Sequence, residues 1–274
     1  MLPHPPHPID VVRAALPAGY DIVDYLDRGG QASVFDGTYT GQRAAIKVFN
    51  PSAEQERVDR EIDALRAIDC DYLVEVLANT TITLLGQRVP VIAYEFLEGG
   101  DLRALLPPAA PGRPGQAILR DIGLHVGTAI EALWSGQPGR RIVHRDVKPA
   151  NIIRSGARNV LVDIGLARHL DLPTITIPGA AAGTRGYMSP EQAMGRRNLT
   201  IHSDVFSFGV TLYHLSAGVH PFNGQQAQIG VVTPVPLSRH RPDLTPDLCR
   251  LVDSMLAVVP HRRPTALAAT FQQM

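Results

Sequence analysis

The sequence predicts an α+β fold with two lobes, a β-rich N-terminal lobe that contains one helix and a mainly helical C-terminal lobe. Short β-type runs bounded by turn residues dominate residues 20–96. Apolar residues at helical spacing dominate from residue 116 onward. The sequence lacks both the strand–helix alternation of a doubly wound nucleotide-binding fold and the GxxxxGK[ST] loop.

Composition narrows the class of protein. Lys plus Arg and Asp plus Glu each number 26, so the balanced charge gives no support for nucleic-acid binding. No apolar run approaches the roughly 20 residues of a membrane span. Cys70 and Cys249 lie outside any CxxC pattern, which favours a reducing compartment, the cytoplasm, without disulfides.

The N-terminal lobe is expected over residues 19–96 and the C-terminal lobe over 97–274, preceded by a mobile Pro-rich tail over 1–18. Alternating β-branched and aromatic residues between glycine turns predict five strands. These cover residues 21–28, 33–40, 42–50, 74–85 and 88–96.

One helix is expected within the β-rich lobe, over residues 52–68, where Ser52 is a suitable N-cap. Its core-facing residues at helical spacing are Val58, Ile62, Leu65 and Ile68.

The C-terminal lobe should contain helices over residues 102–106, 116–135, 203–218, 246–258 and 265–273. The helix over 116–135 should bury Ile118, Ile122, Val126, Ile130 and Leu133. Between residues 222 and 241, Gly230, Pro234 and the β-branched run 231–233 disfavour helix, so a helix there should be stunted or absent.

The stretch over residues 142–165 carries the chemistry. It contains Asp146, Lys148, Asn151 and Asp163. An aspartate can accept a proton from an attacking hydroxyl, and a lysine can neutralise charge on a transferring phosphoryl group. Asparagine and aspartate side chains can hold Mg²⁺ on a triphosphate.

The run His-Arg-Asp-Val-Lys-Pro-Ala-Asn over residues 144–151, followed by Asp163-Ile-Gly, resembles the catalytic loop and metal-binding motif of eukaryotic-type (Hanks-type) Ser/Thr protein kinases. The resemblance covers about residues 20–274 and implies the bilobal protein kinase fold, with the 52–68 helix as helix C. Asp146 and Lys148 would then be catalytic, and Asn151 and Asp163 metal ligands. The composition looks bacterial, and Lys148 favours Ser/Thr over Tyr specificity.

Lys47, in Ala45-Ala-Ile-Lys47, matches the family's lysine strand. The resemblance implies that Lys47 binds the α- and β-phosphates and pairs with Glu61; a solvated strand lysine is the alternative. Asp101 would contact ribose or substrate, or else cap the short helix after it. The implied nucleotide-binding residues are Gly29, Gly30, Val34, Ala45, Lys47, Glu95, Leu97, Asp101 and Ile153.

The glycine-rich hairpin departs from the family pattern. Of the three glycines in Gly-x-Gly-x-x-Gly, only Gly29 is kept, and Asp27 and Ala32 replace the others. Asp27 adds a negative charge near a phosphate site, and Ala32 adds a Cβ where backbone should approach phosphate oxygens.

Residues 163–191 resemble an activation loop that ends in Ser189-Pro-Glu191. Thr174 and Thr176 are the candidates for autophosphorylation, whereas Thr184 aligns with a threonine that contacts the catalytic aspartate and lysine. The resemblance also implies structural residues: Arg145 would bind an activation-loop phosphate, Asp204 would tie down the catalytic loop, and Glu191 would pair with Arg263.

The implied function is transfer of the γ-phosphoryl group of ATP, with Mg²⁺, to protein Ser or Thr hydroxyls, with autophosphorylation in a homodimer as one arrangement. The alternative is a pseudokinase scaffold, which the eroded glycine hairpin favours and the intact base and metal residues oppose. A small-molecule kinase is a third option, opposed by the activation segment.

Overall fold

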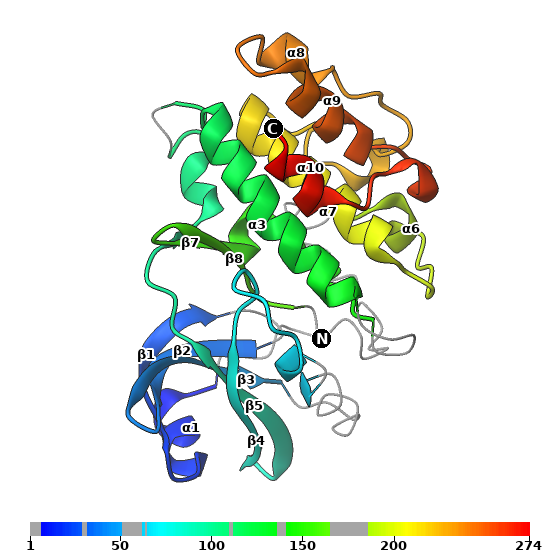
Figure 1. Ribbon diagram of the computed structural model, residues 1–274. Helices are drawn as coiled ribbons and strands as arrows, with labels where there is room; N and C mark the ends of the chain where they lie inside the picture. Colours follow the sequence, from blue (N-terminus) through cyan, green and yellow to red (C-terminus); the bar gives the residue numbers. More distant parts are fainter. Residues whose placement is uncertain are drawn as a thin grey trace. The chain divides into compact units, whose positions relative to one another are not determined.

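The computed structural model describes residues 7–28, 32–50, 62–63, 65–109, 112–135, 141–164 and 186–274. The chain divides into two compact units (Figure 1). The first unit holds the described residues up to Ile68 together with Val74–Leu97, and the second holds Asp69–Leu73 and the described residues from Glu98 onward. The change of unit after Leu97 lies next to the expected lobe boundary.

The first unit is built on an antiparallel five-stranded sheet in the order β1-β2-β3-β5-β4. Each strand lies within two residues of its predicted bounds, because the period-two alternation that predicts strands also decides which face is buried. The strands are β1 (Tyr20–Arg28), β2 (Ala32–Tyr39), β3 (Gln42–Phe49), β4 (Val76–Leu84) and β5 (Gln87–Glu95).

One face of this sheet is covered by a short helix, α1 (Ile9–Ala15) (Figure 1). The expectation of a mobile tail over residues 1–18 is therefore wrong for residues 7–18. Ile9, Val12 and Leu16 recur at helical spacing, and Val12 has no exposed surface within the core of the sheet. The gain from burying these side chains outweighs the low helix propensity of a Pro-rich segment.

Of the helix expected over residues 52–68, the structure describes residues 62–63 and 65–68. Residues 62–63 and 65–66 are helical, and the helix ends before the turn at residue 67. Ile62 and Leu65 are buried, as the predicted apolar stripe requires. Glu61 lies outside the described residues.

The second unit is built on the central helix α3 (Gln116–Trp134), which packs against α7 (Ile201–Ala217) and α10 (Leu267–Gln272) (Figure 1). A fourth helix, α9 (Pro246–Met255), packs against α7. Gly123 of α3 lets α10 approach closely, since a Cβ there would stand 2.3 Å from the ring of Phe271. The buried stripe of α3 begins at Leu119 rather than at the predicted Ile118, which is only half-buried.

A second, three-stranded sheet was not predicted. It consists of β6 (Gly100–Asp101), β7 (Ile152–Ser155) and β8 (Arg158–Leu161). Such short strands leave too few residues for an alternating pattern to stand out. The hairpin of β7 and β8 matters for function because it joins Asn151 to Asp163.

The remaining elements are single turns. The helix predicted to be stunted over residues 222–241 is reduced to the 3-10 turn η3 (Gln226–Gln228) and the short α8 (Leu237–His240), which confirms that prediction. The other short elements are η1 (Leu102–Leu105), η2 (Pro149–Asn151), α6 (Pro190–Ala193) and η4 (Pro260–Arg262).

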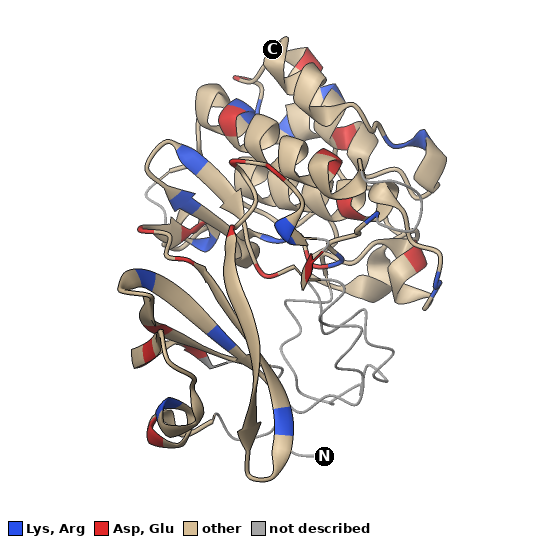
Figure 2. Ribbon diagram, turned by 60° about the horizontal axis from the view of Figure 1, so that its bottom comes forward, with Lys and Arg blue, Asp and Glu red and all other residues tan. Residues whose placement is uncertain are grey.

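Acidic and basic residues are interspersed over both units in Figure 2, in keeping with the balanced charge of the sequence. In the part of the chain that the structure describes, no helix combines the length and apolarity needed to cross a membrane.

Candidate active site

Two of the predicted site residues, Lys148 and Asn151, donate hydrogen bonds to the carboxylate of a third, Asp146. The Lys148 Nζ donates to Asp146 Oδ2 at 2.8 Å, and the Asn151 Nδ2 donates to the same oxygen at 3.1 Å. The Asn151 Nδ2 also donates to the Asp146 backbone carbonyl at 2.8 Å. Asp146 and Lys148 keep 13% and 17% of their side-chain surfaces exposed, so solutes can reach a carboxylate that is otherwise fixed in place.

The turn η2 explains how residues so close in sequence converge. Pro149 occupies the first position of the turn, where its missing N–H leaves no backbone hydrogen bond unmade. The Asn151 N–H donates to the Lys148 carbonyl at 2.9 Å, which closes the turn and aims the Asn151 side chain back at Asp146.

Asp204 anchors the start of the loop that carries Asp146. Its carboxylate accepts hydrogen bonds from the backbone N–H groups of His144 at 2.7 Å and Arg145 at 2.8 Å. Arg145 has a φ of 65°, a left-handed conformation that costs energy for a non-glycine residue. Burial raises the pKa of Asp204 to about 7, opposed by the two backbone N–H donors and the charge of Arg145. The predicted role of Asp204 in tying down this loop is thus met by its contacts.

His144 resembles a general base in sequence but is a structural residue. It has no exposed surface, and its Nε2 donates to the Val162 carbonyl at 3.0 Å. Its Nδ1 accepts from the Asp146 N–H at 3.3 Å. Burial lowers the pKa of His144, so the ring is neutral with both nitrogens committed to backbone.

Asp163 follows β8 and is exposed, with a left-handed φ of 61°. The Val162 N–H donates to the Asn151 carbonyl at 2.9 Å. The two expected metal ligands, Asn151 and Asp163, therefore lie on neighbouring backbone segments joined by a hydrogen bond. Because the Asn151 nitrogen faces Asp146, its Oδ1 is the atom left to face a cation. An amide oxygen and a carboxylate are hard donors that suit Mg²⁺.

These two residues would be the protein's share of the metal site. Among the described residues, no three His, Cys, Asp or Glu side chains are grouped so as to hold a metal ion. Mg²⁺ commonly takes one or two protein ligands and completes its shell with phosphate oxygens and water. The residues present therefore fit a cation that arrives with a nucleotide.

Lys47 belongs to the first unit. It lies in β3, half-buried, opposite Val34 of β2 and Ile92 of β5. Val34, Ala45 and Lys47 share the half-buried face of the sheet, whereas Phe35, Ala44 and Ile46 face the core. The Lys47 Nζ also lies 4.9 Å from the centre of the Phe49 ring. Gly29 and Gly30 lie outside the described residues.

The other residues predicted to contact the nucleotide include some with structural roles, in hydrogen bonds, strand pairing or the core. The Glu95 N–H donates to the Glu75 carbonyl at 3.0 Å, and the Glu95 carboxylate accepts from the Glu75 N–H at 3.2 Å. Leu97, at the end of the first unit, is buried. Ile153 of β7 is half-buried and pairs with Asp101.

Asp101 caps the turn η1, which confirms one of its two predicted roles. Its Oδ1 accepts from the Arg103 N–H at 2.9 Å, and the Arg103 guanidinium binds both of its oxygens, at 2.9 and 2.7 Å. These hydrogen bonds lower the pKa of Asp101. A contact with ribose or substrate stays a prediction.

The predicted pair of Glu191 and Arg263 is present and fully buried on the arginine side. Burial opposes ionisation of Glu191, but the hydrogen bonds and charge of Arg263 outweigh it and lower its pKa. Two residues next to this pair were not predicted. Ser203 Oγ donates to Glu191 at 2.8 Å, and Gln192 Nε2 donates to the Arg145 carbonyl at 2.9 Å.

Gln192 had a recognisable signal. Ser189 and Gln192 form a capping box at the start of α6, in the S-x-x-Q pattern that marks a helix N-terminus. The box places Gln192 where it reaches the strained Arg145. The predicted Thr174, Thr176 and Thr184 lie outside the described residues.

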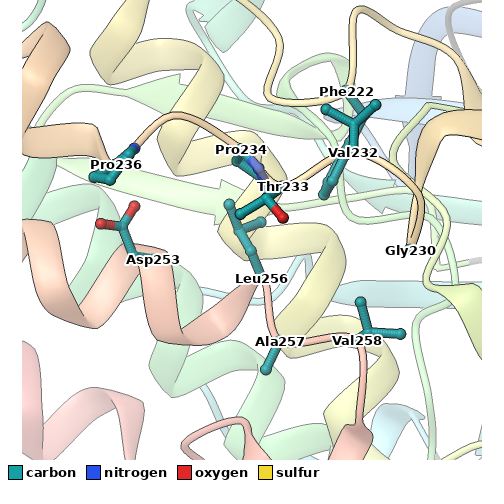
Figure 3. Close-up of a pocket in the computed structure, with 10 residues that line it drawn as sticks. All are labelled: Phe222, Gly230, Val232, Thr233, Pro234, Pro236, Asp253, Leu256, Ala257 and Val258. Carbon is teal, nitrogen blue, oxygen red and sulfur yellow. The ribbon is translucent and has the colours of Figure 1, made fainter.

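A pocket of about 390 Å³ lies in the second unit, lined by ten residues between 222 and 258 (Figure 3). None of the predicted site residues lines it. Asp253 is the one charged residue among the ten, and its carboxylate accepts from the Leu237 N–H at the start of α8. The pocket is thus separate from the loop that carries Asp146. The Asp253 carboxylate in the pocket has a structural role, because it binds the first N–H of α8.

Comparison with known proteins places the chain among kinases. The family model for the protein kinase domain matches residues 20–273. A probable serine/threonine-protein kinase of Corynebacterium efficiens is 32% identical over 93% of this chain and 40% of the relative. The serine/threonine-protein kinase PknB of Mycobacterium leprae is 33% identical over 89% of this chain and 40% of the relative.

Among solved structures, the kinase domain of PknI from Mycobacterium tuberculosis matches with a TM-score of 0.71 and 24% identity, over 96% of this chain and 97% of that one. This likeness establishes the two-unit fold. AfsK of Streptomyces coelicolor, 31% identical, is matched over 89% of this chain and 30% of the relative. The chain thus spans only 30% to 40% of the length of these three curated relatives.

Proposed function

The chain belongs to the protein kinase family, and from this premise we propose that it transfers the γ-phosphoryl group of Mg-ATP to Ser or Thr hydroxyls of proteins. The observation that carries the proposal is the convergence of Lys148 and Asn151 on Asp146 Oδ2. Phosphoryl transfer depends mainly on positioning and electrostatic stabilisation, and these three side chains supply both.

Each residue has a distinct role in the proposal. Asp146 accepts the proton of the attacking hydroxyl, and Lys148, held 2.8 Å from it, offsets negative charge on the transferring group. Asn151 and Asp163 hold Mg²⁺, which neutralises charge on the triphosphate when bound. Lys47 binds the α- and β-phosphates, with Glu61 as its ion-pair partner.

The proposed setting follows from the same premise. The partners are protein substrates and a second copy of the chain, with trans-autophosphorylation of Thr174 or Thr176 as the activating step, in the cytoplasm. Support comes from the bacterial relatives named serine/threonine-protein kinases, each matched over about nine-tenths of this chain.

The test is incorporation of γ-phosphate by the purified protein with Mg-ATP. Asp146→Asn should abolish labelling, because the amide cannot accept the proton, while thermal melting stays close to wild type. Asp121→Asn, on the exposed side of α3, is the matched control and should label normally. Equal labelling of wild type and Asp146→Asn would refute the enzyme. Nucleotide binding without labelling of the wild type would identify a pseudokinase.

A further inference from the structure

The N-terminal segment braces the face of the five-stranded sheet opposite Lys47. We call residues 7–16 the N-terminal brace. Its helix α1 buries Val12 among core residues of β1–β5. At its C-terminal end, Arg13 donates two hydrogen bonds to the Ile22 carbonyl of β1, at 3.0 and 2.7 Å.

The other end of the brace, His7, reaches three strands at once. Its N–H donates to Ser33 Oγ of β2 at 3.3 Å, and its carbonyl accepts from the Tyr25 hydroxyl of β1 at 2.6 Å. Its ring Nε2 lies 3.3 Å from the Phe49 carbonyl of β3, and because a carbonyl only accepts, Nε2 carries the proton. His7 thus joins β1, β2 and β3 at one point.

These contacts fall on the neighbours of two predicted nucleotide residues. Ser33 precedes Val34, and Phe49 lies two residues after Lys47 in β3. Val34 and Lys47 face each other across β2 and β3. Since side chains alternate along a strand, Ser33 points to the brace while Val34 points to the opposite face. Ser33 is 1% exposed, and its hydroxyl accepts the hydrogen bond from the His7 N–H.

We propose that His7 and Ser33 are positioning residues for nucleotide binding, with Tyr25 as their support. Their hydrogen bonds hold the start of β2, at Ser33, and the end of β3, at Phe49. They thereby fix the spacing of Val34 and Lys47 on the other face of the sheet. This inference rests on the proposed function, because it assigns those two residues to ATP. A brace with a stabilising role alone would protect the fold without affecting the nucleotide.

The test compares hydrogen-bond variants at the two ends of the brace. Tyr25→Phe and Ser33→Ala each remove one bond at the His7 end, and Tyr25→Phe keeps the ring against Phe35. His7→Leu removes the bond to the Phe49 carbonyl, and His7→Gln restores a donor. Arg13→Met, at the far end, is the matched control.

We expect the His7-end variants to weaken ATP by about three- to tenfold in KM and in Kd, in line with the loss of one hydrogen bond. The value of kcat at saturating ATP should stay within about twofold, and His7→Gln should recover most of the affinity. Amide exchange at residues 32–34 and 48–49 should speed up. Arg13→Met should lower the melting temperature and leave KM within about twofold of wild type.

The inference would be overturned if the variants at the His7 end and Arg13→Met lowered the melting temperature equally, while the KM for ATP and the amide exchange at residues 32–34 and 48–49 stayed unchanged. A wild-type protein that binds no nucleotide would defeat the proposed function instead. The exchange measurement on the nucleotide-free protein still decides whether His7 fixes the strand ends, so the two failures are told apart.

Discussion

Glu191 and Arg263 form a two-point ion pair, with guanidinium nitrogens 2.7 and 3.0 Å from the two carboxylate oxygens, although 72 residues separate them. The Arg263 side chain has no exposed surface and also donates to three backbone carbonyls, those of Ala257, Val258 and His202. This one side chain therefore joins α6, α7 and the loop before η4.

Arg263→Met should lower the free energy of unfolding by about 3–5 kcal/mol, because it leaves the buried Glu191 carboxylate without its counter-charge and three carbonyls without the hydrogen bonds from Arg263. Urea denaturation measures the loss. The double variant with Glu191→Leu should lose less than the sum of the single changes, since it removes the stranded charge as well. A loss below about 1 kcal/mol in Arg263→Met would contradict the buried-pair interpretation.

Asp27→Asn should tighten ATP binding if the charge beside the phosphates impedes it. The expected gain is about two- to fivefold in Kd, in keeping with removal of one screened like-charge interaction. Asp24→Asn, exposed on the same strand, is the control and should change nothing. Titration with Mg-ATP at low and high salt checks the cause, because an electrostatic gain should shrink as salt rises. Equal affinity in all three proteins would show that the hairpin tolerates the charge.

Phosphorylation of the active protein should appear at Thr174 or Thr176. The two residues lie in the polar, Pro-flanked middle of the predicted activation loop, whereas Thr184 is expected to contact the catalytic residues. Peptide mapping by mass spectrometry after incubation with Mg-ATP is the measurement. Asp146→Asn incubated alone should stay unmodified. Active wild-type protein with no phosphate on either threonine would refute self-activation at this loop.

Acid should destabilise the second unit through His220. Burial and the neighbouring His214 lower the pKa of His220 to about 4, opposed by a hydrogen bond with the Gly186 backbone, and the His220 ring also lies against the rings of Tyr187 and Phe222. Above the unfolded value of about 6.5 both states are neutral and stability is full. Between about 6.5 and 4 the unfolded chain binds the proton first, so stability falls as pH falls.

His220→Asn should therefore lose about 2 kcal/mol less than wild type between pH 7 and pH 5. Asparagine can still accept the hydrogen bond that Phe222 N–H donates to His220 Nδ1. Denaturation curves at the two pH values give the difference. His261→Asn, at an exposed position on η4, serves as control. Parallel losses in wild type and His220→Asn would rule out this histidine as the acid-sensitive group.

The sequence was most informative where burial follows a fixed period. The bounds of the strands in the five-stranded sheet and of α3 were predicted within two residues, because alternation and helical spacing record directly which side chains face the core. The sequence placed Asp146, Lys148 and Asn151 within six residues, but the contact between Lys148 and Asp146 was not predicted. Long-range partners such as Asp204 and Arg263 came only through the family resemblance, since a single sequence carries no record of contacts across tens of residues.

Other features escaped prediction for identifiable reasons. The strands of the small sheet are too short for periodicity, and Gln192 was overlooked although Ser189 and Gln192 carry a capping signature. In α1, the proline-rich start at residues 3–8 masked the spacing of Ile9, Val12 and Leu16. Helix α1 forms there because its apolar side chains pack against the sheet, which a Pro-rich composition does not reveal.

The burial of Val12 has a practical consequence for anyone shortening this protein. Trimming to residue 20, where the match to the kinase family model begins, would remove Val12 from the hydrophobic core and expose apolar side chains of the sheet to water. Recombinant versions should retain everything from His7 onward, or poor solubility will be mistaken for an inactive enzyme.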